Sequence, residues 1–494
     1  MKSHQKRSEL EKYFSQFRKN IIGIDSSFIS PFGERKIIYA DWVASGRLYR
    51  PIENAISEII GPYVGNTHSE ASETGMLMTQ AYQYAHEIIK KHVHAGKEDI
   101  IITANAGMTG VVCKFQRILG LKMPEQLSGK INCAQDDRPV VFVTHVEHHS
   151  NHTSWLETIS DVVVLEPDQN LLVNPDTLRE QLARYWDRKI KIGAFSACSN
   201  VTGYQPPIHE LARIMHENHG LCFVDFAASA PYVHINMHPG NPGEDLDAIY
   251  FSPHKFLGGP GSSGVLVFNK MLYHNRIPDH PGGGTVRWTN RWNEYSYITD
   301  VEAREDGGTP GFLQAIRAAL CVRLKEKMGV DPMQSREHEL LEFIFNELPK
   351  IEGLQILAPN IRDRLGVVSF YLKKVHHNLV TKLLNDLYGI QVRGGCSCAG
   401  TYGHFLLNVD KVTSHEIVNR IEHGDLSLKP GWVRLSLHPT MTQIELETMV
   451  NAIRDISENY ERYSKDYRYD NSNNEYMNTI RPSSSIQVSD WFNR

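Results

Sequence analysis

Residues 246–255 read LDAIYFSPHK, an apolar run that ends in a short polar turn. Similar runs alternate with helix-period stretches across residues 36–325, and they include DIIITA, PVVFVTH, KIGAFSA, GLCFVDF and SGVLVFN. Between the middle runs, NPDTLREQLARYW and IHELARIMHENH have the apolar spacing of amphipathic helices. This alternation predicts the α/β class, with a large, doubly wound, mostly parallel sheet and helices on both faces. Ligands of such folds bind beyond the carboxyl ends of the strands.

Changes in the sequence pattern divide the chain into four segments. We expect an N-terminal segment over residues 1–35, a large domain over 36–325 and a smaller C-terminal domain over 326–465. The smaller domain mixes helical stretches such as QIELETMVNAIRDISENYERY with strand-like ones such as WVRLSLH, which predicts an α+β arrangement. We expect residues 466–494 to form a polar tail that is extended or disordered.

Composition excludes several classes of protein. Charged residues make up 22% and the net charge is -5, so neither nucleic acid nor an anionic membrane is expected as a partner. No apolar run is long enough to span a bilayer, and the first residues lack the apolar core of a signal peptide. The 7 cysteines are odd in number and irregularly spaced, which is typical of reduced thiols. We therefore expect a cytoplasmic protein.

Lys255 follows the apolar run DAIYF, at a predicted strand end. A lysine buried there tends to lose its proton, and its neutral amine can form a Schiff base with an aldehyde. A lone lysine in such a turn is more often an ordinary surface residue. Asp225, however, ends the preceding run GLCFVD. It is either a helix cap or the carboxylate that keeps the ring nitrogen of pyridoxal 5′-phosphate protonated, and its pairing with Lys255 favours the cofactor.

A third feature suits the phosphate of such a cofactor. Asn105–Gly110 reads NAGMTG and lies between the run DIIITA and the helical stretch VVCKFQRIL. Small residues, a hydroxyl group and free backbone N–H groups at a helix N-terminus bind phosphate. Gly107, Met108 and Thr109 therefore form the predicted phosphate turn, although glycine-containing turns between strands and helices are common without this role.

Together these motifs resemble the class V aminotransferase family, and in particular its cysteine desulfurase and selenocysteine lyase branch. The resemblance covers roughly residues 36–450 and rests on the order and spacing of short motifs, which are YADWVAS (39–45), GMT (107–109), EHHSN (147–151), SNVTG (199–203), SPHK (252–255), GTP (308–310) and VRLSLHPT (433–440). It implies fold type I of the pyridoxal-phosphate-dependent transferases, with a large and a small domain, and a homodimer.

The resemblance implies a role for each matching residue. His148 stacks on the cofactor ring, Lys255 carries the Schiff base, and Arg434 binds the carboxylate of an amino acid substrate. Asn200 lies near both cofactor and substrate, and Thr309 reaches the phosphate of the neighbouring subunit. The complete set of expected cofactor-binding residues is Gly107, Met108, Thr109, His148, Asn200, Asp225, Ser252, His254, Lys255 and Thr309.

Two cysteines in the stretch VRGGCSCAG, residues 392–400, are the candidates for sulfur chemistry. The resemblance places Cys398 on the nucleophile of the family, and Cys396 lies two residues before it. A thiolate on a loop flanked by glycines can swing toward a substrate, and Arg393 would help to keep it ionised. The motif Gly-Cys-x-Cys is also similar to a motif in the sulfurase domain of molybdenum cofactor sulfurases. Both cysteines can instead be ordinary thiols on a turn.

Four histidines lie close together in the sequence, as the ligands of a metal ion can. The spacing of His145, His148, His149 and His152 matches no standard zinc motif, and Cys396 and Cys398 are too close in sequence for a paired zinc site. No metal is therefore expected.

The predicted function is removal of sulfur or selenium from a cysteine-type amino acid through a persulfide on Cys398, which leaves alanine. A protein that accepts the sulfur would then be a partner. The alternative is a class V enzyme without sulfur chemistry, namely an aminotransferase, an epimerase or a lyase. Two departures support this alternative: Ala228 stands where the family usually bonds the ring hydroxyl, and Asn66–Ser72 lacks the desulfurase arginine. A catalytically silent scaffold is disfavoured because the cofactor and carboxylate residues are retained.

Overall fold

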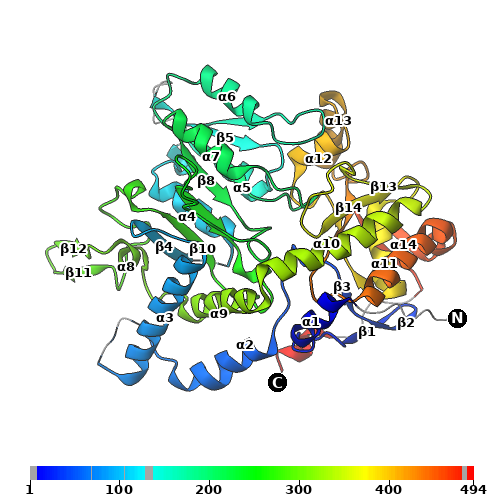
Figure 1. Ribbon diagram of the computed structural model, residues 1–494, viewed down its shortest axis with the longest axis horizontal. Coiled ribbons are helices and arrows are strands. Elements are labelled where there is room, and N and C mark those ends of the chain that lie inside the picture. The colour runs from blue at the N-terminus through cyan, green and yellow to red at the C-terminus, as the bar shows by residue number, and fades with distance from the viewer. Residues whose placement is uncertain are drawn as a thin grey trace. The chain divides into compact units, whose positions relative to one another are not determined.

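The structure is a computed structural model that describes residues 8–67, 69, 71–104, 106–127, 137–480 and 487–493. The chain folds as two compact units (Figure 1). Unit 1 contains Met1–Val43, Asn200–Tyr204 and Asp331–Arg494, whereas unit 2 contains Ala44–Ser199 and Gln205–Val330. Asn105, which opens the predicted phosphate turn, lies outside the described residues, as do two residues within Asn66–Ser72.

Unit 2 is built around a sheet of seven described strands in the order β4-β10-β9-β8-β7-β5-β6. Its strands are β4 (Asp99–Ala104), β5 (Val140–Thr144), β6 (Asp161–Leu165), β7 (Lys191–Ser196), β8 (Leu221–Asp225), β9 (Ala248–Phe251) and β10 (Gly264–Asn269). Strands β5 to β9 pair in parallel, whereas β10 is antiparallel to both β9 and β4. The carboxyl ends of β4, β8 and β9 therefore lie at the same edge of the sheet.

Helices accompany this sheet, as Figure 1 shows for α4 to α7. The helices of unit 2 are α2 (Arg50–Asn54), α3 (Glu73–His92), α4 (Met108–Ile118), α5 (His149–Leu156), α6 (Pro175–Arg184), α7 (Ile208–Glu217), α8 (Val301–Glu305) and α9 (Phe312–Met328). The apolar face of α4 packs into the core through Val111, Val112 and Phe115, beside Phe223 of the sheet. Burial of such a face, rather than helix propensity alone, stabilises each helix. The predicted α/β class with a mostly parallel sheet is confirmed.

Shorter elements complete unit 2. Strands β11 (Val286–Thr289) and β12 (Tyr295–Tyr297) form an antiparallel hairpin in a stretch with little sequence pattern. The short 3-10 and π turns of both units are Ala55–Ile60, Gly61–Tyr63, Glu125–Leu127, Pro253–Lys255, Lys270–Leu272, Leu348–Lys350, Ser464–Asp466 and Val488–Trp491.

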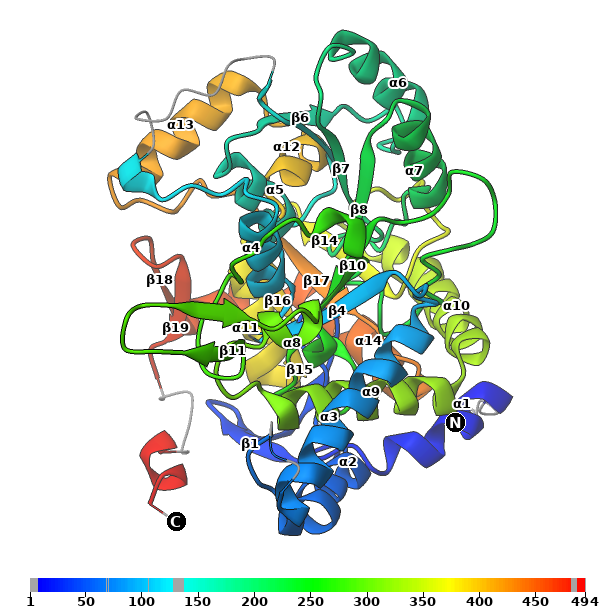
Figure 2. The same cartoon turned by 90° about the vertical axis from the view of Figure 1, so that its left-hand side faces the viewer.

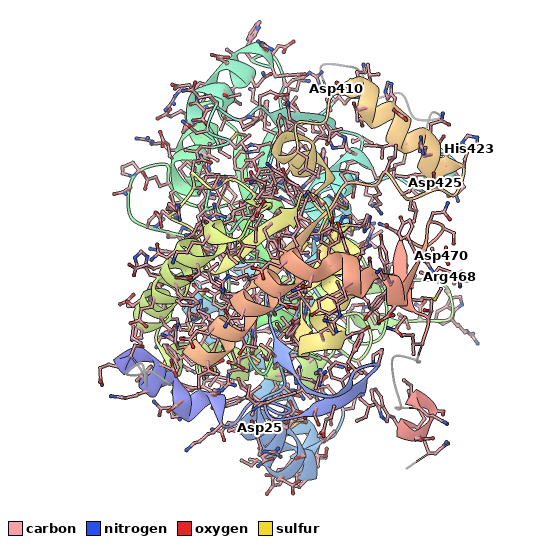
Figure 3. All side chains as sticks on the ribbon, turned by 90° about the vertical axis from the view of Figure 1, so that its right-hand side faces the viewer. Asp25, Asp410, His423, Asp425, Arg468 and Asp470 are labelled. Carbon is pink, nitrogen blue, oxygen red and sulfur yellow. The ribbon has the colours of Figure 1, made fainter. Side chains whose placement is uncertain are left out.

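Unit 1 centres on an antiparallel sheet of order β13-β14-β17-β16. Its strands and the flanking pairs are β13 (Leu354–Ile356), β14 (Val367–Leu372), β16 (Arg393–Gly395), β17 (Trp432–Ser436), β1 (Ser27–Ser30), β2 (Gly33–Lys36), β3 (Ile38–Tyr39) and β15 (Ile390–Gln391). Its helices are α1 (Glu9–Arg18), α10 (Val330–Glu347), α11 (His377–Tyr388), α12 (Gly400–Leu406), α13 (Lys411–Glu422) and α14 (Gln443–Tyr463). Asp410 and His423 mark the two ends of α13 (Figure 3).

Within the polar C-terminal stretch, which was expected to be extended or disordered, residues 467–478 contain two extended strands. Strands β18 (Tyr467–Asp470) and β19 (Glu475–Asn478) form an antiparallel hairpin, visible in Figure 2. The Tyr467 hydroxyl donates to Asp386 of α11 at 2.8 Å, and the Asn378 amide donates to the Asn474 carbonyl at 2.5 Å. These contacts with α11 stabilise a segment whose own composition predicts no structure.

Among the described residues, no helix combines the length and apolarity that a bilayer crossing requires.

Candidate functional site

The predicted phosphate turn lies at the carboxyl end of β4, where α4 begins. The Met108 backbone N–H donates to Ser252 Oγ at 2.8 Å. A methyl group on Gly107 would lie 3.2 Å from Ser252 Oγ and 3.5 Å from the His254 ring, so a side chain would fill this space. The turn after β4 and the turn after β9 therefore converge on one small polar cradle at the N-terminus of α4.

A second set of contacts joins the N-termini of α4 and α5. Thr109 Oγ1 and Ser150 Oγ lie 2.7 Å apart, and either can donate. The Ser150 backbone N–H donates to His148 Nδ1 at 3.1 Å, so the imidazole caps α5. This bond fixes the orientation of the His148 ring beside the phosphate turn, as stacking on a flat cofactor would require.

The Asp225 carboxyl is buried at the end of β8, with 4% of the residue exposed. Its Oδ1 accepts a hydrogen bond of 2.7 Å from the Ala227 backbone N–H. Burial raises the pKa of Asp225 to about 7, against the opposing effects of the Ala227 N–H and the charge of Lys255. A carboxyl group held this way needs a cationic partner to ionise fully.

His254 and Lys255 lie on the 3-10 turn Pro253–Lys255 that follows β9. Burial and, to a smaller extent, the charge of Lys255 together lower the pKa of His254 to about 4. The imidazole is therefore neutral at physiological pH and can act as a hydrogen-bonding group. The His254 carbonyl accepts from the Gly46 backbone N–H at 2.9 Å, which anchors the turn.

Residues predicted to bind the substrate are brought together in unit 1. Arg434, on β17, donates through Nη1 to the Asn200 carbonyl at 3.2 Å and through Nη2 to Asp41 Oδ1 at 2.7 Å. The Asn200 side-chain amide donates to the Ser397 carbonyl at 2.6 Å. Asn200 therefore connects the arginine to the cysteine loop.

The cysteine loop has an unusual backbone. Ser397 and Cys398 are consecutive non-glycine residues with φ of 53° and 56°, in the left-handed region that most side chains avoid. Cys398 is exposed, Cys396 is half-buried and Ser397 is buried. Burial of Ser397 and its bond from Asn200 hold a turn that presents the Cys398 thiol outward.

Comparison with known proteins gives a consistent answer. The sequence model of the class-V aminotransferase family matches residues 38–449. The chain belongs to this family. A probable cysteine desulfurase of Halalkalibacterium halodurans is 27% identical over 372 residues, which are 74% of this chain and 84% of that protein. One of Staphylococcus epidermidis is 28% identical over 369 residues, with the same coverage of 74% and 84%.

Solved structures place the fold among class-V aminotransferases of fold type I. The apo cysteine desulfurase from Thermococcus onnurineus NA1 has a TM-score of 0.70 at 22% identity, over 90% of this chain and 98% of that one. The cysteine desulfurase CsdA from Escherichia coli has a TM-score of 0.70 at 21% identity, with the same coverage of 90% and 98%. At these identities the likeness establishes the fold alone.

The residues at the sheet edge of unit 2 fit pyridoxal phosphate. At Gly107 a methyl group would make tight contacts with Ser252 and His254, and the N-terminus of α4 favours an anion beside these groups. The buried Asp225 carboxyl suits a protonated pyridine nitrogen, since a cation would offset its desolvation. Both features lie at the sheet edge that carries Lys255.

The residues that are predicted to bind the cofactor and the substrate are divided between the two units. The cofactor residues Asp225 and Lys255 belong to unit 2, whereas Asn200, Cys398 and Arg434 belong to unit 1. Thr309 is exposed on the segment between α8 and α9 of unit 2, and its predicted contact with a neighbouring subunit stays a prediction.

Two residues that the sequence reasoning left without a role take part in these contacts. Asp41 pairs with Arg434, as described above. Glu147 is buried beside His148 and accepts from the Ser196 N–H at 2.9 Å and the Asn151 amide at 2.7 Å. Both lie inside motifs that resemble the family, and the presence of an acidic residue in each motif was the available signal.

Proposed function

We propose that this member of the class-V aminotransferase family is a pyridoxal 5′-phosphate-dependent cysteine desulfurase. It would remove sulfur or selenium from a cysteine-type amino acid and leave alanine. Family membership and the desulfurase names of the relatives support the proposal. The observation that carries it is the exposed Cys398 thiol on a left-handed turn, in the same unit as Arg434 and within its electrostatic reach.

Unit 2 would hold the cofactor. Ser252, His254 and the N–H groups of the Gly107–Thr109 turn would bind its phosphate, and His148 would stack on its ring. Asp225 would keep a proton on the ring nitrogen, and Lys255 would bind the aldehyde carbon. Pyridoxal phosphate, when bound, supplies an electron-accepting ring to the substrate. The Lys255 amine, once released by substrate, would carry the proton at the substrate Cα.

Unit 1 would handle the substrate. Arg434 would bind its carboxylate, and Asn200 would orient it. The Cys398 thiolate would attack the substrate sulfur, forming a sulfur–sulfur bond as the carbon–sulfur bond breaks. The electron pair of the broken bond stays with the substrate carbon, which takes up a proton to give alanine. Cys398 then carries the sulfur as a persulfide for a partner protein that accepts it.

The test is an assay of the purified holoenzyme with L-cysteine, L-selenocysteine and a panel of other amino acids. Sulfide or selenide is measured in the presence of a reductant, together with alanine. Release of alanine and sulfide in equal amounts from L-cysteine is the expected result. Turnover of other amino acids without sulfide would overturn the sulfur chemistry and leave the cofactor assignment standing.

One observation favours the second candidate, a class-V enzyme that works without sulfur. Ala228 is 9% exposed and follows Asp225 by three residues, and its methyl group offers no hydrogen bond to a ring hydroxyl. A transaminase, epimerase or lyase with a different ring environment fits this position. The same amino acid panel distinguishes these activities by their products.

The active assembly would be a homodimer in which Thr309 reaches the phosphate of the neighbouring subunit. An isologous interface of this kind would complete two equivalent sites. The cysteines described here are free thiols, which suits a reducing cytoplasm.

A further inference from the structure

Asp41 is fixed beside β17 by a hydrogen bond of each neighbouring segment to Ser436. The Ser436 N–H donates to the Ala40 carbonyl at 2.8 Å, and the Val43 N–H donates to Ser436 Oγ at 3.0 Å. Asp41 itself forms a parallel bridge with Ser436, two residues after Arg434. The carboxylate of Asp41 is therefore held by the backbone at a defined place next to the Arg434 guanidinium.

The two oxygens of Asp41 are divided between two arginines. Oδ1 accepts from Arg434 Nη2 at 2.7 Å, and Oδ2 accepts from Arg393 Nε at 3.1 Å. Arg393 and Arg434 face each other across the antiparallel pair β16 and β17. Like charges directly opposite on neighbouring strands repel, so Asp41 offsets a repulsion that the register creates.

Among the described residues, the ion pairs of this cluster set two guanidinium cations against one carboxylate, so one positive charge is left over. The Arg434 side chain is 4% exposed, and within the described part of the chain its buried Nε has no hydrogen-bond partner. Asn200 Oδ1 and Ser397 Oγ are also buried without partners there. Unpaired buried polar groups are costly unless a ligand satisfies them. Arg434 Nε and the Ser397 hydroxyl can each donate a hydrogen bond to an anionic group, whereas Asn200 Oδ1 can only accept one, as from the ammonium group of an amino acid.

We propose that Asp41 determines substrate specificity, because it cancels one of the two arginine charges and so selects an amino acid with one anionic group over one with two. This inference rests on the proposed function, in which Arg434 binds the substrate carboxylate. Asp41 is a positioning residue with no contact of its own to the substrate. Removing its charge leaves two cationic arginines, which favour a ligand with two carboxylates.

The experiment is calorimetric titration of the holoenzyme with L-alanine and L-aspartate, which differ in one carboxylate. The wild type is expected to bind L-alanine more tightly. Asp41→Asn should shift the ratio of the two dissociation constants toward L-aspartate by about tenfold, the effect of one added charge in a partly screened site. Arg393→Gln, at a half-exposed side chain, should weaken binding of both ligands.

The double variant Asp41→Asn/Arg393→Gln again carries one net positive charge and should restore the wild-type preference, as should Asp41→Glu. A purely structural role for Asp41 would not predict this rescue. If Asp41→Asn does not fold, the Arg393→Gln variant alone tests the proposal. Unchanged affinity of Arg393→Gln for L-alanine would overturn the charge argument.

Arg434→Ala separates the inference from the function on which it rests. One decisive outcome is that Arg434→Ala binds neither ligand while Asp41→Asn keeps the wild-type ratio of the two dissociation constants. That pair of results would overturn the role of Asp41 and leave the proposed function intact. Undiminished binding of L-alanine by Arg434→Ala would instead contradict the carboxylate site itself.

Discussion

Burial raises the pKa of the Asp225 carboxyl to about 7, and the charge of Lys255 opposes that rise. Asp225 ends β8 and Lys255 follows β9, and these two adjacent strands are parallel. Without a cofactor, Asp225 therefore holds a proton near neutral pH. Arrival of a cationic ring would reverse this preference, because an opposite charge favours the ionised carboxylate. With Asp225 in its proposed role, cofactor binding and the charge state of this carboxyl would depend on each other.

The first prediction concerns Asp225→Asn in the cofactor-free protein. The carboxyl pKa is about 7 in the folded protein, against the ordinary value of 3.8, so the folded state retains a proton that the unfolded chain releases. The contribution of this group to stability is complete below pH 3.8 and is lost as the pH rises to about 7. Asparagine removes this loss, so the melting temperature of the variant relative to wild type should be higher at pH 8 than at pH 5. A difference that is independent of pH would contradict the buried carboxyl.

The second prediction concerns Lys255. The purified protein should be yellow, and borohydride should fix the cofactor to Lys255, as peptide mass spectrometry would show. Lys255→Ala should remove the covalent link while the phosphate cradle still binds free pyridoxal phosphate. Arg317→Ala is a matched control in the same unit, because Arg317 pairs with Glu53 and has no predicted cofactor role. A protein that neither is coloured nor responds to added cofactor would contradict the whole assignment.

The third prediction separates the two cysteines of the left-handed turn. Cys398→Ser should abolish sulfide release from L-cysteine and keep the absorbance of the bound cofactor, because only the exposed thiol is removed. Cys396→Ser should retain most of the activity. If the Cys396 variant is inactive instead, Cys396 is the nucleophile. If the double variant turns over its best substrate at the wild-type rate, neither thiol takes part and the second candidate function is favoured.

The fourth prediction tests the C-terminal hairpin. Tyr467→Phe removes the hydroxyl that donates to Asp386, which is buried, and should lower the free energy of unfolding by about 1–3 kcal/mol. Urea denaturation followed by circular dichroism measures the change. Tyr460→Phe is the control, because the Tyr460 hydroxyl contacts Glu461 on an exposed surface and its loss should have little effect. Equal stability of both variants would mean that the hairpin does not support α11.

The elements that were predicted well are those whose apolar period is uninterrupted. The stretch QIELETMVNAIRDISENYERY is the helix α14, which begins at a capping box of Thr442 and Glu445. The apolar run before Lys255 is the buried strand β9. In these segments the local pattern and the tertiary burial agree, so periodicity alone was sufficient.

The elements that could not be predicted depend on distant partners. The hairpin β18–β19 is polar, and its order comes from contacts with α11 across the chain. Asp41 gains its role only because the segment after β3 lies beside β17, which brings the Asp41 carboxylate to Arg434 over 393 residues of sequence. No local pattern contains that information, since the pairing is decided by the packing of unit 1.

The assembly of unit 1 from three separate stretches has a consequence for how the protein is made. During synthesis on the ribosome, all residues of unit 2 emerge before the last stretch of unit 1, Asp331–Arg494, so the cofactor half can fold first. The first residues of the chain must wait until translation has passed Arg434 before Asp41 finds its partner. A nascent chain stalled before Cys396 would carry Lys255 and Asp225, the residues proposed to bind the cofactor, but neither the arginine proposed to bind the substrate nor the two cysteines of residues 396–398.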